Sequence, residues 1–285
     1  MLCKKPYWKG NQAYGCGQCL FCRINKRRLW THRILLESLM HTDNAFITLT
    51  YSPDYLPENG TLVPKHLTDF IKRLRKNYGK AIRYYAVGEY GDKSQRAHYH
   101  IAAFGIHFED AAIGKSWNFG HIHSGTITKD SAQYIASYTV KKLTSKDDPK
   151  LFGRHPEFAR MSRKPGIGAG AVEKIARDLE TKQGAELISK MLDVPSTITH
   201  DGKQWPIGRY LKQRLRDEIG YENLGNATPE TQARAAEMQV LLDSKNFFDR
   251  PLKSFEKTSI LNAHNAQKQL NSERRFKIFN QSKKI

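Results

Sequence analysis

The spacing of apolar and polar positions predicts alternating strands and helices in the first half of the chain. Residues 45–51 (Ala-Phe-Ile-Thr-Leu-Thr-Tyr) are rich in β formers and end at Ser-Pro, as a strand does. Residues 64–78 begin with Pro, carry apolar side chains at helical spacing and end at Gly79. The same reasoning predicts strands at 81–89, 98–104 and 120–128, and a helix from Asp130 to about Leu143. This order predicts an α+β fold, an antiparallel sheet with packed helices.

The segments on either side of this core have other patterns. Apolar residues from Ile24 to Leu39 recur at helical spacing, with basic residues on the outer side. Asp201-Gly202 predicts a hairpin turn, and further helices are expected from about residues 171, 209, 229 and 253. The expected organisation is a cysteine-rich basic N-terminal extension (1–44), a core (45–145) and a mostly helical C-terminal extension (146–285).

Two imidazoles lie on one face of a predicted strand. Side chains alternate faces along a strand, so His98 and His100 point the same way. If residues 91–96 form the turn, Glu89 falls roughly opposite His98 with its side chain on that face. One carboxylate and two imidazoles can hold a divalent cation, Mg²⁺ or Mn²⁺, and leave positions for phosphate oxygens. Ordinary half-buried histidines are the alternative.

A second His-x-His pair is present at His121 and His123. It has no obvious facing carboxylate on a neighbouring strand. We therefore rank this pair below the first as a metal site, and interpret it as a decoy or a DNA-facing sheet edge.

Two phenols and two lysines gather on the last predicted helix of the core. Tyr134 and Tyr138 are four residues apart, and Lys141 and Lys142 follow three and four residues later, which places all four on one face. A tyrosine can attack a phosphodiester and remain covalently attached to it. Its pKa is ordinarily about 10, and nearby lysines would favour the phenolate. The alternative is a pair of core aromatic residues.

All four cysteines lie in the first 22 residues. Cys16, Cys19 and Cys22 form Cys-x-x-Cys-x-x-Cys, and Cys3 lies upstream. Four thiolates at such spacings can hold one structural zinc ion. Free thiols, a redox pair and an iron–sulfur cluster are the alternatives.

The charge indicates a polyanionic partner. Lys and Arg total 47 against 28 Asp and Glu, a formal net charge of +19, and nucleic acid is the commonest partner of such a chain. The candidate phosphate-binding residues are Arg23, Lys26, Arg27 and Arg28 after the cysteines, and Arg163 and Lys164 in the glycine-rich segment 162–170. A solvated basic face and a flexible loop are the alternatives.

Other functions are disfavoured by what the sequence lacks. No Walker A motif is present, so we do not expect ATP hydrolysis. No apolar run approaches the length of a membrane span, and the N-terminus has no apolar signal core, so we expect a reducing cytoplasm and no membrane partner.

Taken together, the motifs carry a resemblance to a known family. Phe46-Ile-Thr-Leu-Thr50, the Glu89, His98 and His100 set, and the tyrosine–lysine segment resemble the ordered motifs of HUH-type replication initiators. The cysteine-rich N-terminus, Gly88-Glu-Tyr-Gly91 and the segment 162–168 resemble, more closely, the replication initiation proteins of gokushovirus-type microviruses. The resemblance covers roughly the first 170 residues, and Tyr99 in the histidine motif departs from the usual aliphatic residue.

The resemblance implies a HUH endonuclease core that starts rolling-circle replication in the host bacterial cytoplasm. It maps the metal ligands onto His98, His100 and Glu89, and the nucleophiles onto Tyr134 and Tyr138. One tyrosine would keep the 5′-phosphate of single-stranded or supercoiled circular viral DNA at the origin, and release a 3′-OH that primes a host polymerase. A host helicase is also implied, with no small-molecule cofactor. A transposase or relaxase of the same chemistry, and a non-catalytic zinc-stabilised single-strand-binding protein, remain rivals.

Overall fold

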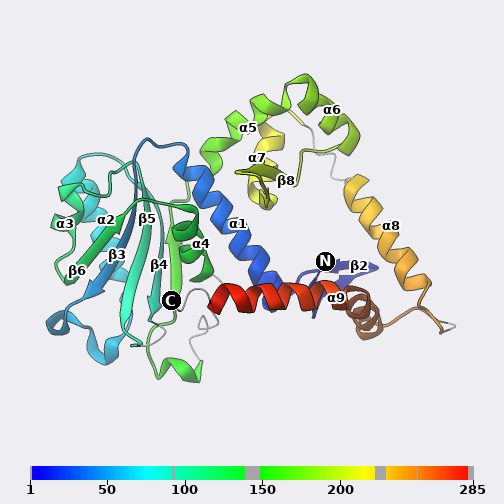
Figure 1. The fold of residues 1–285 in the computed structure, drawn as a ribbon, viewed down its shortest axis with the longest axis horizontal. Coiled ribbons are helices and arrows are strands. Elements are labelled where there is room, and N and C mark those ends of the chain that lie inside the picture. The colour runs from blue at the N-terminus through cyan, green and yellow to red at the C-terminus, as the bar shows by residue number, and fades with distance from the viewer. Residues whose placement is uncertain (1, 92–93, 139–147, 222–228, 249, 282–285) are drawn as a thin grey trace. The chain divides into compact units, whose positions relative to one another are not determined.

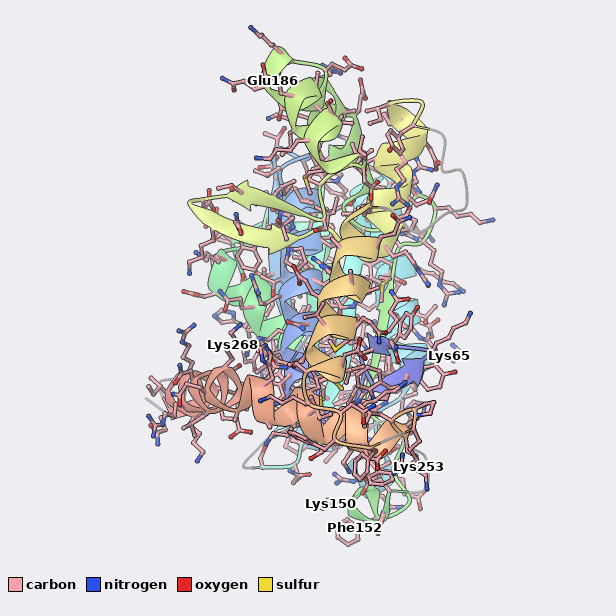
Figure 2. The ribbon with its side chains drawn as sticks, turned by 90° about the vertical axis from the view of Figure 1, so that its right-hand side faces the viewer. Lys65, Lys150, Phe152, Glu186, Lys253 and Lys268 are labelled. Carbon is pink, nitrogen blue, oxygen red and sulfur yellow. The ribbon has the colours of Figure 1, made fainter. Side chains whose placement is uncertain are left out.

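The computed structural model describes residues 2–91, 94–138, 148–221, 229–248 and 250–281. The chain forms two compact units. One consists of Met1–Lys26, Ala185–Val194 and Glu222–Ile285, and the other of Arg27–Gly184 and Pro195–Tyr221. Lysine side chains project from the surfaces of both, among them Lys65 and Lys268 (Figure 2). No helix in the described ranges combines the length and the apolar character needed to cross a membrane.

The second unit is built on a five-stranded antiparallel sheet in the order β6-β3-β5-β4-β7. The strands are β3 (Asn44–Tyr51), β4 (Arg83–Tyr90), β5 (Ala97–Phe104), β6 (Gly120–Gly125) and β7 (Phe158–Met161). The expected α+β fold is therefore confirmed. Two details differ from the prediction, since the strand expected at 120–128 ends at Gly125 and the short β7 was not anticipated.

Helices cover both faces of this sheet (Figure 1). On one face, α2 (Pro64–Tyr78) and α3 (Ala111–Ser116) pack against the side chains that include Leu49, Tyr99 and Ile101. On the other face, α1 (Leu20–Ser38) and α4 (Lys129–Tyr138) pack against Ala102 and Phe104. Because strand side chains alternate, the even-numbered positions of β5 all face α4.

The end of α1 differs from the expected apolar stripe. The helix ends at Ser38, and Leu39 lies beyond it with 63% of its surface exposed. Asn44 Nδ2 donates to the Ser38 carbonyl at 3.0 Å and so satisfies one of the free carbonyls at this helix end.

The remaining elements of the second unit include a hairpin. It joins β8 (Thr197–His200) to β9 (Lys203–Pro206) through Asp201 and Gly202, whose φ angles are 49° and 65°. Two consecutive positive φ angles are what a two-residue hairpin turn needs, so the Asp-Gly prediction is confirmed. The other elements of this part of the chain are η1 (Pro53–Tyr55), η2 (Glu58–Gly60), η3 (Pro149–Leu151), η4 (Ala169–Ala171), α5 (Val172–Leu179), α6 (Lys182–Met191) and α7 (Gly208–Glu218).

The first unit brings the two ends of the chain together. It holds β1 (Tyr7–Lys9), β2 (Gln12–Tyr14), the start of α1, α8 (Pro229–Asp243) and α9 (Ser254–Gln281). Trp8 Nε1 donates to Thr258 Oγ1 at 2.9 Å, and Lys257 Nζ donates to Asn11 Oδ1 at 2.6 Å. The long C-terminal helix therefore packs on the N-terminal hairpin. The three-part division expected from the sequence stays a prediction.

A buried carboxylate ties α1 to its neighbours. Glu37 is 2% exposed and accepts hydrogen bonds from Arg83 and, at 2.6 Å, from the Gly168 amide. Gly168 has a φ of 80°, and a Cβ there would lie 3.1 Å from the Arg33 carbonyl oxygen. The Gly166 amide donates to Tyr210 Oη at 2.8 Å. These two amides thus serve internal contacts, and neither supplies the phosphate nest considered for segment 162–170.

We expect Glu37→Ala to lower the free energy of unfolding by about 3 kcal/mol, because it leaves the Arg83 charge and a buried amide without their acceptor. Urea unfolding followed by circular dichroism measures the change. Lys65→Ala, which removes an exposed partner of Asp69, is the control and should change stability little. Equal effects of the two substitutions would contradict the role given to Glu37.

Candidate active site

The sheet register brings Glu89, His98 and His100 together. Glu89 on β4 pairs with His98 on β5, as the turn expected at 91–96 requires. Glu89 Oε1 lies 2.8 Å from His98 Nε2 and 3.0 Å from His100 Nε2. The possible ligand atoms of all three residues lie within 4.8 Å of one another. One carboxylate oxygen and two imidazole nitrogens thus converge on one point.

Neighbouring groups hold both imidazole rings in place. His98 Nδ1 donates to the Arg96 carbonyl at 2.9 Å, and His100 Nδ1 lies 2.9 Å from Thr48 Oγ1. The Phe46 ring stacks on His100 with centroids 5.8 Å apart. Residues that ligate a metal through one ring nitrogen are commonly held in this way through the other. Sequence reasoning missed Thr48 and the Arg96 carbonyl, although residue 48 lies on the same face of its strand as residues 46 and 50.

The three side chains fit a divalent cation. A carbonyl only accepts, so His98 Nδ1 carries the hydrogen and the neutral ring turns its Nε2 lone pair towards Glu89. Glu89 is 1% exposed and His100 5% exposed, so water does not separate these acceptors. A positive charge between them, a proton or a cation, removes the repulsion. Carboxylate oxygen and imidazole nitrogen are suitable ligands for Mn²⁺ and Mg²⁺.

Both tyrosines of α4 face this group. Tyr134 Oη lies 3.4 Å from His100 Nε2, and the Tyr138 ring stacks on the His100 ring with centroids 5.6 Å apart. Their own rings meet edge to face at 4.9 Å. Tyr138 is 8% exposed, and burial followed by the Glu89 charge raises the pKa of its hydroxyl well above the ordinary value. Lys141 and Lys142, expected on the same helical face, lie outside the described residues.

The second histidine pair lies elsewhere on the sheet. His121 and His123 are exposed on the strand β6 and pair with Thr50 and Thr48 of β3. They belong to neither of the candidate metal groups in the described part of the chain. Their place at the sheet edge agrees with the lower rank that the sequence gave them as ligands.

The four cysteines form a second candidate metal site, in the first unit. Their sulfur atoms lie within 4.8 Å of one another, with Cys19 Sγ 3.7 Å from Cys3 Sγ. Burial raises the pKa of Cys22 to about 12. Burial also opposes ionisation of Cys16, but the amides of Cys19 and Gln18 and the neighbouring thiols lower its pKa to about 6. Four converging sulfurs suit tetrahedral zinc.

The expected DNA-binding residues fall in three places. Arg23 and Lys26 belong to the first unit, while Arg27 and Arg28 line a pocket of the second. Arg163 and Lys164 are exposed after β7. Their contact with DNA stays a prediction.

Comparison with known proteins identifies the family. Residues 44–143 match a family model described as a replication-associated protein of the ORF2 type. The chain is 30% identical, over 268 residues, to the replication-associated protein ORF2 of Spiroplasma virus 4, an alignment that covers 84% of this chain and 80% of that protein. The chain belongs to this family of phage replication-associated proteins. The resemblance drawn from the sequence motifs is thereby confirmed.

Two further relatives carry the same description. The replication-associated protein VP4 of Bdellovibrio phage phiMH2K is 34% identical over 223 residues, 70% of this chain and 66% of that protein. The replication-associated protein ORF4 of Chlamydia phage 1 is 29% identical over 152 residues, 45% of this chain and 38% of that protein. No solved structure matches the chain.

We expect the purified, reduced protein to carry about one zinc ion per chain, and Cys19→Ser to lose most of it, because a structural site needs all four ligands. Elemental analysis by mass spectrometry measures the zinc. His98→Ala, which leaves the cysteines intact, is the control and should keep its zinc. Protein that contains neither zinc nor iron would support the free-thiol alternative.

Proposed function

We propose that the chain nicks and rejoins single-stranded viral DNA and so starts rolling-circle replication of a circular phage genome. The observation that carries the proposal is the position of Tyr134 and Tyr138 against His100, an imidazole of the Glu89, His98 and His100 group. Phenols beside a candidate metal group are the parts that transesterification of a phosphodiester needs. The phage replication proteins to which the chain is similar support the biological setting.

Glu89, His98 and His100 would hold the cation, which supplies positive charge to the scissile phosphate when bound. Tyr134 Oη attacks phosphorus, and the bond between phosphorus and the 3′ oxygen breaks. The phenol loses its proton as the new bond forms, and the departing 3′ oxygen gains one. The products are a 5′-phosphotyrosine and a free 3′-OH, which a host polymerase would extend with a host helicase opening the duplex.

The two tyrosines have different surroundings, and we infer that they act in order. The Tyr134 hydroxyl reaches the edge of His100 where the candidate ligand atoms converge, and its side chain is only half buried. Tyr138 instead lays its ring flat against His100 and is almost fully buried. Tyr134 is therefore assigned the first attack, and Tyr138 the second transfer, which releases a closed circle after one round of synthesis.

A non-catalytic single-strand-binding protein would explain the charge of +19 and the four-cysteine group. It would not need two phenols on one imidazole of a carboxylate–histidine group. A transposase or relaxase of the same chemistry would need them, but the relatives are phage replication proteins.

We expect Tyr134→Phe to lower the rate of covalent adduct formation by at least about tenfold, which corresponds to about 1.4 kcal/mol in the barrier. Tyr138→Phe should still form the adduct but release no closed circles, and the double variant should form none. The assay uses single-stranded oligonucleotides that tile the encoding phage genome, Mn²⁺ and denaturing electrophoresis.

Phe removes only the hydroxyl, so packing on α4 is kept. Tyr55→Phe, at an exposed tyrosine outside the site, is the matched control and should behave as the wild type. An adduct in the double variant that maps to another residue would overturn the assignment of both tyrosines.

We expect His98→Ala and His100→Ala each to abolish cleavage while leaving DNA binding largely intact, because binding rests mainly on lysine and arginine contacts with phosphate. Cleavage is followed with Mn²⁺ and with Mg²⁺, and binding by fluorescence anisotropy. His121→Ala and His123→Ala are the matched controls on the same face of the sheet, and should cut at close to the normal rate. The reverse ranking would mean that the wrong histidine pair has been assigned.

A further inference from the structure

A basic pocket adjoins the helix that carries the tyrosines, within the second unit. Its volume is about 460 Å³, which lies in the range of about 300–1,000 Å³ common for small-molecule sites. Helix α1, helix α4 and the hairpin strand β9 supply its lining. The lining residues are Arg27, Arg28, Thr31, Gln133, Lys203, Gln204 and Trp205.

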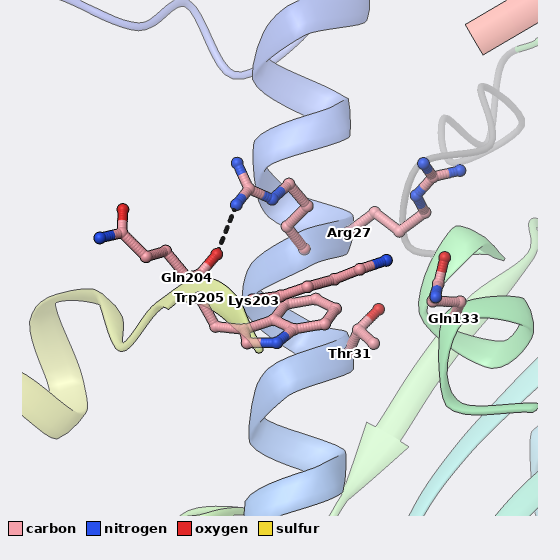
Figure 3. A pocket seen from close by; sticks show the side chains of 7 residues that line it. Arg27, Thr31, Gln133, Lys203, Gln204 and Trp205 are labelled. Atoms are coloured by element: carbon pink, nitrogen blue, oxygen red, sulfur yellow. Dashed lines mark hydrogen bonds between the residues drawn. The ribbon is translucent and has the colours of Figure 1, made fainter. Parts of the chain in front are cut away.

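The chemistry of the lining suits a nucleotide. Three lining residues are cationic and none is acidic, which favours a phosphate. Trp205 offers an aromatic surface, and the Gln133 and Gln204 amides can both donate to and accept from the edge of a base. In Figure 3 the Lys203 side chain runs beside the Trp205 ring and its ammonium points towards Gln133.

The pocket is held in shape by contacts of the hairpin with α1. Arg28 Nη2 donates to the Gln204 carbonyl at 2.8 Å, the bond drawn in Figure 3. His32 Nδ1 donates to the Pro206 carbonyl at 3.2 Å, and its ring stacks on Trp205 with centroids 5.7 Å apart. The hairpin therefore presents Trp205 from a fixed position.

A buried hydroxyl also belongs to the lining. Thr31 is fully buried, and its Oγ1 has no hydrogen-bond partner among the described residues. A threonine inside a helix ordinarily bonds to the carbonyl four residues earlier, and Thr31 does not. A buried hydroxyl without a partner costs free energy, which a polar ligand in this pocket would offset.

Gln133 links the pocket to the chemistry. It directly precedes Tyr134, and consecutive residues of a helix point about 100° apart. Tyr134 faces the sheet and His100, so Gln133 faces a neighbouring side of α4. A strand whose phosphate lies at Tyr134 need only pass around α4 to reach the pocket.

We propose that this pocket binds one nucleotide of the DNA strand that flanks the scissile phosphate, with its phosphate at Arg28 and Lys203 and its base at Trp205 and Gln133. The proposal rests on the proposed function for the position of the scissile phosphate. It adds a recognition subsite formed by the hairpin, which lies about 70 residues after the tyrosines in the sequence.

The test compares two strands of equal length, a fluorescein-labelled oligothymidylate and a chain of abasic residues, without added Mg²⁺ or Mn²⁺. Wild-type protein should bind the oligothymidylate about tenfold more tightly, since stacking contributes about 1–3 kcal/mol per base. Gln133→Ala should reduce this preference, and Lys203→Met should weaken binding of both strands. Lys174→Ala, at an exposed lysine outside the lining, is the matched control and should weaken binding less than Lys203→Met.

Photocrosslinking tests the same proposal without a substitution. An oligothymidylate that contains 5-iododeoxyuridine should crosslink to the peptide that holds Trp205. Equal binding of the two strands by the wild type, or crosslinks confined to other peptides, would overturn the proposal. Because this assay needs no cleavage, it separates the pocket from the nuclease. An intact adduct assay with no base preference refutes the pocket alone, and a base preference without an adduct refutes the nicking proposal alone.

Discussion

The candidate site depends on one buried carboxylate. Glu89 is almost fully buried and has imidazole nitrogens at 2.8 and 3.0 Å, and a carboxylate in such a place is stable only with positive charge beside it. That requirement reaches into the sheet, because the imidazoles meet Glu89 only in this register of β4 and β5. A slip of one residue would turn His98 and His100 to the opposite face, where α2 packs.

The same sheet face determines where the tyrosines lie. Ile135 and Ala136 of α4 are buried against it, together with Ala102 and Phe104 of β5. With that side of the helix packed, Tyr134 and Tyr138 are turned towards His100. Metal ligands and nucleophiles are thus placed by one hydrophobic interface, and Glu37 secures the neighbouring α1 through its bonds to Arg83 and Gly168.

Local patterns predicted much of this site, and contacts distant in sequence account for the rest. Period-two alternation and a short turn were enough to place Glu89 opposite His98, and a four-residue spacing placed both tyrosines on one helical face. The packing of α9 on the N-terminal hairpin leaves no such local signal, since Trp8 and Thr258 are 250 residues apart. The pocket of Trp205 and Gln133 was missed for the same reason. The glycine-rich segment misled, because a buried partner, Glu37, already takes the Gly168 amide.

The packing of α4 also limits how two tyrosines could share one phosphate. For Tyr138 to take the position of Tyr134 by movement of the helix, α4 would have to advance about one turn, or about 5.4 Å. That shift would pull Ile135 and Ala136 out of a close-packed core, at a cost of several kcal/mol for such side chains. Rotation of the tyrosine side chains, or movement of the DNA strand past a fixed helix, avoids that cost. In the proposed mechanism the exchange between nucleophiles is therefore a motion of side chains and substrate, and the sheet, α4 and the carboxylate–histidine group stay in place.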